Sequence, residues 1–165
     1  MEPAFEPSRL LCPKCGAVGS MARHAHYMRH FVFLREGKVT DEVIAVTRLR
    51  CISCGATHAL LPLAAVPYSV FSIRFIAMML LDSLDHTFPS IEVLCAHYKI
   101  AINTFYRIRR RFESCVRIAR GITAKKDCVY EMARKMLENA MTDLDFVLSS
   151  FFDACGMSFC QSRSP

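Results

Sequence analysis

The sequence lacks any apolar run long enough to cross a membrane. Its longest hydrophobic stretch, residues 70–84, is interrupted by Arg74 and Asp82, and it is shorter than the roughly 20 apolar residues that span a bilayer. The first seven residues carry two acids and two prolines, without the basic start and apolar run of a secretory signal. We therefore expect a core helix at 70–84, no membrane partner and a cytoplasmic location.

Familiar catalytic motifs are also missing. The sequence contains no GxxxxGK phosphate loop, no serine nucleophile elbow and no paired carboxylate and histidine in a strand context. It has no internal repeat and no low-complexity tract. A chain of 165 residues that is 53% hydrophobic can fold as one domain or two small ones. We expect a globular protein that is not an enzyme.

Acidic residues are scarce in one stretch of the chain. Residues 99–126 carry nine basic side chains and one acidic, a net charge of +8, against +1 for residues 1–98 and −3 for residues 127–165. This asymmetry is typical of a surface that binds nucleic acid. A solvated basic helix without a partner would have the same composition, and that alternative stays open.

Four of the nine cysteines form two copies of one short motif. The sequences Cys-Pro-Lys-Cys-Gly at 12–16 and Cys-Ile-Ser-Cys-Gly at 51–55 each let two thiolates reach one ion. An odd cysteine count without an export signal argues against a disulfide framework. The motifs predict one structural, four-coordinate Zn²⁺ ion, held by Cys12, Cys15, Cys51 and Cys54.

Several alternatives accompany this prediction. Iron would use the same four ligands, and His58 could replace one of the thiolates. A thioredoxin-like redox pair fits poorly because the motif is duplicated. His24, His26, His30 and His58 are all expected on the surface or in the hairpin rather than as ligands. Cys95, Cys115 and Cys128 are expected to be buried fillers. Cys155 and Cys160 are expected to be free thiols in a frayed tail, with a disulfide or a second metal site as alternatives.

Hydrophobic periodicity predicts an α+β fold. The pattern indicates a β-hairpin from 26–35 and 42–50, followed by helices near 70–84, 90–98, 101–120 and 126–153. The last helix is long and amphipathic, with an apolar face of Val129, Met132, Met136, Ala140, Leu144, Val147 and Phe151. We expect a zinc ribbon at 10–66, a helical domain at 67–121, and a C-terminal helix and tail at 122–165.

Residues 90–108 have the order of a helix-turn-helix. Ser90 can cap a first helix, Lys99 and Ile100 can form the turn, and a second helix begins near Ala101. In this register the core residues are Leu94, Ile100, Phe105 and Ile108. The second helix then offers groups that reach bases and phosphates. Asn103 and Tyr106 are assigned to bases, Arg109, Arg111 and Arg117 to the DNA backbone, Arg107 and Arg110 to either, and Ile102 lies beside them.

These motifs resemble known families. The paired Cys-x-x-Cys-Gly turns over residues 10–60 resemble zinc ribbons, and residues 90–108 resemble the helix-turn-helix of transposases and resolvase-like proteins, although Lys99 replaces a small turn residue. The order of motifs over 10–112 is similar to a bacterial family of transposon-associated zinc-ribbon proteins without assigned activity, and to the N-terminal part of insertion-sequence transposases. We expect no RNase-H-like catalytic domain of a transposase, because only residues 113–165 follow the part that shows the resemblance.

The resemblance and the charge pattern together predict a function. We expect a sequence-specific protein that binds double-stranded DNA at the nucleoid, either as a transcription regulator or at the ends of mobile elements. A homodimer and a transposase or other protein are further candidate partners. The alternative is a non-catalytic adaptor whose ribbon and acidic C-terminal helix bind proteins.

Overall fold

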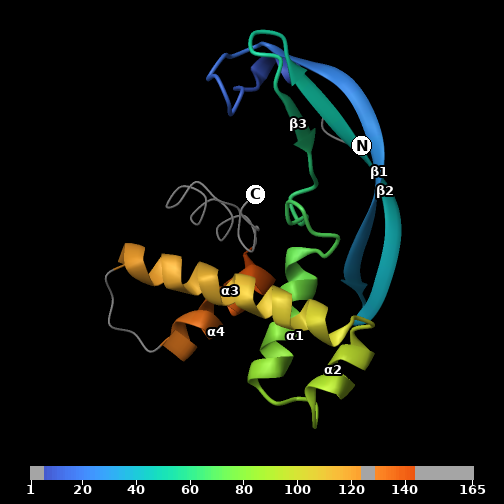
Figure 1. Cartoon of the computed structure of the whole chain (residues 1–165), viewed down its shortest axis with the longest axis vertical. Helices are drawn as coiled ribbons and strands as arrows, with labels where there is room; N and C mark the ends of the chain where they lie inside the picture. The colour runs from blue at the N-terminus through green and yellow to red at the C-terminus, as the bar shows by residue number, and fades with distance from the viewer. Residues whose placement is uncertain (1–5, 124–128, 144–165) are drawn as a thin grey trace. The chain divides into compact units, whose positions relative to one another are not determined.

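The computed structural model describes residues 6–123 and 129–143 and has an α+β fold, as the sequence predicts (Figure 1). A three-stranded antiparallel sheet, in the order β1-β2-β3, is followed by four helices. The elements are a 3-10 turn at Pro7–Arg9, β1 Met21–Arg35, β2 Lys38–Cys51, β3 Thr57–Leu60, α1 Ile73–Leu84, α2 Ile91–His97, α3 Ile102–Thr123 and α4 Val129–Thr142.

The chain forms two compact units. One unit, the ribbon unit, combines the chain up to His30 with Val43–Pro62, and the other, the helical unit, combines Phe31–Glu42 with the chain from Leu63 onward. Both strands of the β1-β2 hairpin therefore contribute residues to both units. The domain limits expected from sequence, 10–66, 67–121 and 122–165, stay predictions.

The predicted hairpin is present and longer than expected. Its two strands are joined by Glu36 and Gly37, which have φ angles of 51° and 74°, the left-handed conformation that a tight two-residue turn requires. The third strand, β3, was not predicted. It is only four residues long, and it pairs with β2 in a register that places Leu49 opposite His58 and Arg50 opposite Thr57.

The helical unit has its own hydrophobic core. All four helices contribute to it, and the largest fully buried side chains in this unit are Tyr98, Phe75, Phe105, Ile73, Met79, Leu94, Leu137 and Val66. Helix α1 packs against α2 and α4, and α3 packs against the same two helices. Cys95 and Cys115 are buried in this core, each 2% exposed, which confirms their prediction as apolar fillers.

Ser72 joins the base of the hairpin to α1. Its hydroxyl accepts a hydrogen bond from the Phe75 amide and caps the helix, at 3.1 Å. Its own amide donates to the Val32 carbonyl at 2.8 Å, and the Val32 amide donates to the Val70 carbonyl at the same distance. Val32 and the neighbouring strand residues also pack on the helical core, so this part of the hairpin belongs to the helical unit.

The described part of α4 is amphipathic, as predicted, but its buried face is centred on Leu137, which the predicted apolar face omits. Ala133, Leu137 and Ala140 are buried against the rest of the helical unit, and Met132 and Met136 are partly buried beside them. The predicted continuation of this helix to residue 153, together with Cys128, Cys155 and Cys160, lies outside the described residues. None of the helices in the described ranges combines the length and hydropathy of a membrane span.

Candidate metal centre and nucleic-acid interface

The two Cys-x-x-Cys-Gly segments fold into the same turn. In the first, the Cys12 amide donates to the Ala17 carbonyl at 2.9 Å, and in the second the Cys51 amide donates to the Ala56 carbonyl at 2.8 Å. Gly16 and Gly55 both have a φ of 72°. A side chain at either position would strain the backbone, which explains why glycine follows the second cysteine of each turn.

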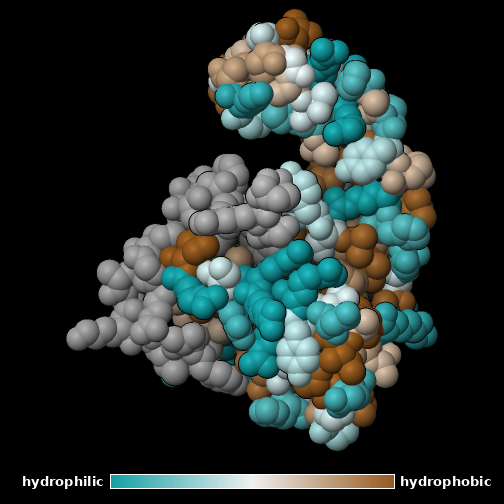
Figure 2. Space-filling model, viewed as in Figure 1, coloured by the Kyte–Doolittle hydropathy of each residue, from teal (hydrophilic) through white to brown (hydrophobic). Residues whose placement is uncertain are grey.

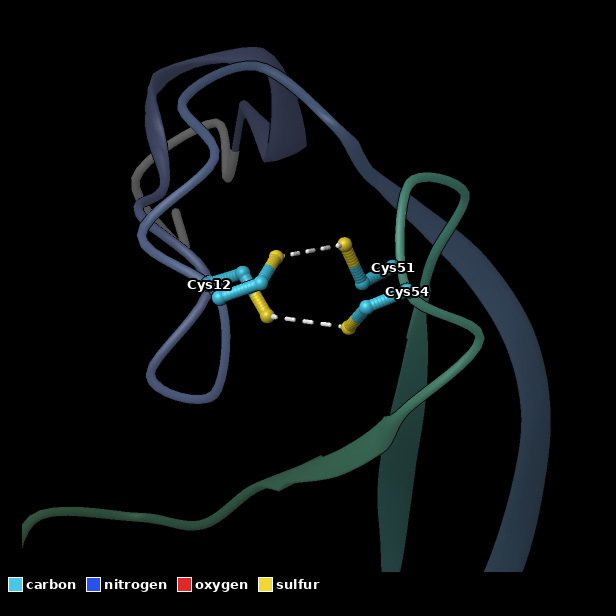
Figure 3. A group of neighbouring side chains, drawn as sticks. Cys12, Cys51 and Cys54 are labelled. Carbon is cyan, nitrogen blue, oxygen red and sulfur yellow. Dashed lines mark hydrogen bonds between the residues drawn. The ribbon is translucent and has the colours of Figure 1, made fainter.

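The four predicted metal ligands lie together. The sulfurs of Cys12, Cys15, Cys51 and Cys54 are all within 4.8 Å of one another, and these are the only such cluster among the described residues. Figure 3 shows side chains from the two turns pointing toward each other, with Sγ separations of 3.8 Å for Cys12 and Cys54 and 3.7 Å for Cys15 and Cys51. Four sulfurs about 2.3 Å from a tetrahedral metal ion are about 3.8 Å apart. The arrangement therefore fits a metal-binding site.

The electrostatics of the cluster favour a cation. The backbone amide of Cys54, assisted by that of Ser53, donates to the Cys51 sulfur and lowers the pKa of the Cys51 thiol to about 6. At Cys15 the Ala17 amide lowers the pKa, but the neighbouring sulfur of Cys54 and burial outweigh it and raise the pKa to about 12. Without a cation, adjacent sulfurs cannot all be negative, and a metal ion in place of the protons removes this conflict.

His58 lies beside the cluster rather than on an open surface. Its Nε2 atom is 3.5 Å from the Cys12 sulfur and its side chain is partly buried. Since four sulfurs already surround the site, His58 can act as a hydrogen-bonding neighbour that orients the Cys12 thiolate. Sequence reasoning favoured a surface position because β3, which carries His58, was not predicted. His24, His26 and His30 are exposed on β1, as expected.

The apolar core around the cysteines is small. It consists of Met21, Leu49, Cys12 and Cys51, with Leu10 and Cys54 packed beside them. A core of this size contributes little hydrophobic stabilisation, and small units of this kind ordinarily rely on a metal ion or disulfides to fold. None of the described cysteines forms a disulfide, so no disulfide among them supplies that stability to the ribbon unit.

Helices α2 and α3 are joined by a compact turn. Lys99 adopts a left-handed conformation with a φ of 52°. Its amide donates to the Ala96 carbonyl, and the Ile100 amide donates to the Cys95 carbonyl. These two hydrogen bonds form a Schellman motif, which ends a helix sharply. The expected core positions Leu94, Phe105 and Ile108 are buried, and Ile100 packs on the core.

One face of α3 is polar, basic and exposed. Leaving aside the flanking Arg109 and Arg111, the predicted contact residues on this face are Ile102, Asn103, Tyr106, Arg107, Arg110 and Arg117, and all of them are exposed. In Figure 2, which has the same view as Figure 1, hydrophilic side chains gather over α3. The opposite face of the helix is buried through Phe105, Ile108 and Phe112. This exposed side, from Asn103 to Arg117, is called the Asn103 face below.

Three of the predicted DNA-contacting arginines differ from the others in what surrounds them. Arg109 lies on the flank of α3 and pairs with Glu113, with its Nε atom 2.9 Å from the carboxylate oxygen. Arg109 and Arg117 also line a cavity of about 680 Å³ between α1, α3 and α4, whose floor includes Leu84, Phe112 and Val116. Arg111, on the other flank, is partly buried. The roles of these three arginines stay predictions.

Comparison with known proteins places the chain in a family. Residues 12–108 match a domain of unknown function, DUF6431. The chain belongs to this family. No curated protein and no solved structure matches it. The match covers both cysteine turns and α2, and it ends within α3. The family description names no activity, so the resemblance to transposon-associated proteins stays a prediction.

Proposed function

We propose that the protein binds double-stranded DNA in a sequence-specific manner, with α2 and α3 acting as a helix-turn-helix and the cysteine cluster holding one structural Zn²⁺ ion. The observation that carries this proposal is the Asn103 face of α3. It combines amide, phenol and guanidinium groups on one exposed side of a helix whose other side is anchored in the core. These are the groups that read base edges and hold phosphates in a major groove.

The turn before α3 supports the assignment. A second helix can enter a groove only if its N-terminal residues project beyond the first helix, which requires a short, rigid connection. The Schellman turn at Lys99 provides one. The left-handed position of such a turn is usually filled by glycine. Lys99 occupies this position here, despite its side chain.

The residues of α3 divide by chemistry. Asn103 and Tyr106, in the first turns of the helix, are suited to base edges, because an amide can pair with adenine and groove contact begins at the helix N-terminus. Arg107 and Arg110 can contact guanine or phosphate. Arg111 and Arg117 are suited to the backbone, and Arg109 contributes less because Glu113 already neutralises it.

The role proposed for zinc is stability. Four thiolates complete a tetrahedral shell, so the ion has no open position for substrate and would fix the two turns of the ribbon unit. Sulfur ligands also suit iron, and zinc is preferred here because it is the usual ion of closed four-cysteine sites. No catalytic step is part of the proposal. The protein would serve transcription regulation or recognition of mobile-element ends, which require the same binding step.

Selection of bound sequences from random duplex DNA tests the proposal. The zinc-loaded full-length protein should enrich a defined motif, and an Asn103→Ala, Arg107→Ala double variant should not. A matched control is Val93→Ala in α2, an exposed position away from the Asn103 face, which should enrich the same motif. If the wild-type protein enriches no motif, the site-selective function is wrong and the adaptor hypothesis gains support.

A further inference from the structure

The segments that carry the cysteine turns of the ribbon unit contain no acidic residue, and the acids of this unit, Glu2 and Glu6, precede them in the sequence. Residues 10–30 and 43–62 hold five Lys and Arg side chains and not one Asp or Glu. The acidic residues of the hairpin, Glu36, Asp41 and Glu42, all lie in the segment that belongs to the helical unit. The net charge of residues 1–98 is only +1 because acidic residues outside these segments offset their positive charge. The ribbon unit is therefore a second cationic surface, separate in sequence from α3.

Two arginines share one exposed face of the ribbon sheet. On β2, Arg48 and Arg50 alternate with Leu49 and Cys51, which are 2% and 0% exposed. Alternate residues of a strand point to opposite faces, so both arginines lie on the face opposite Leu49, and both are exposed. The Arg50 guanidinium extends along the second cysteine turn and lies next to Gly55. Their partners across β3 are small and exposed: Ala59 opposite Arg48 and Thr57 opposite Arg50. No bulky neighbour on β3 screens the arginines from a flat partner.

Among the described residues, no carboxylate neutralises the charges on this face. Arg9, elsewhere in the ribbon unit, pairs with Glu6 at 2.7 Å, whereas in the part of the chain that the structure describes neither Arg48 nor Arg50 has a carboxylate partner. The guanidinium of Arg48 instead lies 5.9 Å from the ring centre of Tyr27, a side chain that is 36% exposed. Packing on a ring limits the side-chain freedom of the arginine and leaves its hydrogen-bond donors available.

We propose that this face, formed by Arg48, Arg50 and Tyr27, binds the phosphate backbone of DNA and anchors the protein without reading sequence. Residues two apart on a strand are about 7 Å apart, a spacing close to that of neighbouring phosphates on one DNA strand. Each guanidinium can hold one phosphate through paired hydrogen bonds. Because residues 10–30 and 43–62 contain no Asp or Glu, no carboxylate in these segments repels an approaching DNA backbone. This inference rests on the proposed function, because it takes DNA as the partner. The residues that carry it are different from those of the Asn103 face.

The test measures how the affinity of the zinc-loaded full-length protein for random-sequence duplex DNA depends on salt. Each phosphate contact adds about 0.9 to the slope of log affinity against log salt. The Arg48→Gln, Arg50→Gln double variant should therefore lose roughly 1.8 from the slope. Arg9→Gln is the matched control: it removes a charge that Glu6 already neutralises, and it should leave the slope nearly unchanged. Zinc content and thermal unfolding are measured on every variant.

A second variant leaves both arginines in place. Thr57→Glu introduces a carboxylate directly across from Arg50 and should weaken binding in the same way, while Thr57→Gln should not. If Arg48→Gln, Arg50→Gln loses zinc, the Thr57 pair decides the question. An unchanged slope in the folded variants would overturn the proposal, as would an equal loss in Arg9→Gln.

The two proposals fail separately. In one outcome, the Asn103→Ala, Arg107→Ala variant loses motif selection while the ribbon variants keep the wild-type salt slope. This outcome would support α3 as the element that reads sequence and would contradict the proposed phosphate contacts of the ribbon. A reduced slope in the ribbon variants, together with no motif selected by the wild-type protein, would retain the anchor and remove the sequence-specific function.

Discussion

Arg109 and Glu113 form an ion pair along one turn of α3, with 2.9 Å between Nε and the carboxylate oxygen. The next residue, Arg110, is exposed on the Asn103 face. Two adjacent arginines therefore differ in whether another described residue neutralises their charge. Because a neutralised arginine releases fewer counterions on binding DNA, the pair offers a controlled comparison.

Arg110→Gln should weaken DNA binding and reduce the salt slope by about 1. Arg109→Gln should change the slope much less, because the charge it removes is already offset by Glu113. Glu113→Gln, which frees Arg109, should raise affinity at low salt. Salt titrations of the three variants on one duplex provide the measurement. Equal losses for Arg109→Gln and Arg110→Gln would show that the ion pair does not matter.

The cysteine cluster should hold one equivalent of zinc. Cys51→Ser should lose the metal and unfold the ribbon unit, because metal binding and folding are coupled in units with so small a core. Ile52→Ala, at a 75% exposed position in the same turn, should keep both. Elemental analysis and amide exchange of residues 10–30 and 43–62 report the outcome. A metal-free protein with native protection in these ranges would contradict the prediction.

Tyr98 should contribute to the stability of the helical unit. Its hydroxyl donates to the Asp82 carboxylate at 2.6 Å, and a hydrogen bond to a charged group contributes about 1.5–3 kcal/mol. Tyr98→Phe should lower the free energy of unfolding by about this amount. Tyr106→Phe, at an exposed site, should have little effect. Urea denaturation of the two variants makes the comparison.

The same tyrosine predicts a pH dependence. Burial, together with the Asp82 carboxylate, raises the pKa of Tyr98 above its ordinary value of 10.0. The folded state therefore holds the phenol proton more tightly than the unfolded state, so this stabilisation is complete below about pH 10 and declines as the pH rises further. Urea denaturation at a series of alkaline pH values should show a steeper loss for the wild-type protein than for Tyr98→Phe. Parallel curves would count against the prediction.

Local patterns in the sequence predicted the cysteine cluster and the helices. Each cysteine turn is closed by a hydrogen bond over a few residues, from Cys12 to Ala17 and from Cys51 to Ala56, so spacing alone predicted that the four cysteines lie together. The α1 helix and the burial of Leu94 and Phe105 followed from periodicity in the same way.

Features that depend on contacts across the chain were not predicted. Strand β3 has only four residues, too few for an alternating pattern, and its pairing with β2 is what places His58 beside Cys12. The pairing of Arg109 with Glu113 was within reach of sequence analysis, since residues four apart on a helix are neighbours. The basic ribbon required knowing that residues 31–42 belong to the other unit.

The most direct test of the central claim compares wild-type protein with Asn103→Ala on the selected site and on copies of it with one base pair changed at a time. At physiological salt, wild-type protein should lose about 1–3 kcal/mol for each changed pair in the site. Asn103→Ala should lose this discrimination at one position, keep it elsewhere and retain the wild-type salt slope. An identical discrimination profile for the two proteins, persisting in the Asn103→Ala, Arg107→Ala double variant, would contradict the claim that α3 reads the DNA.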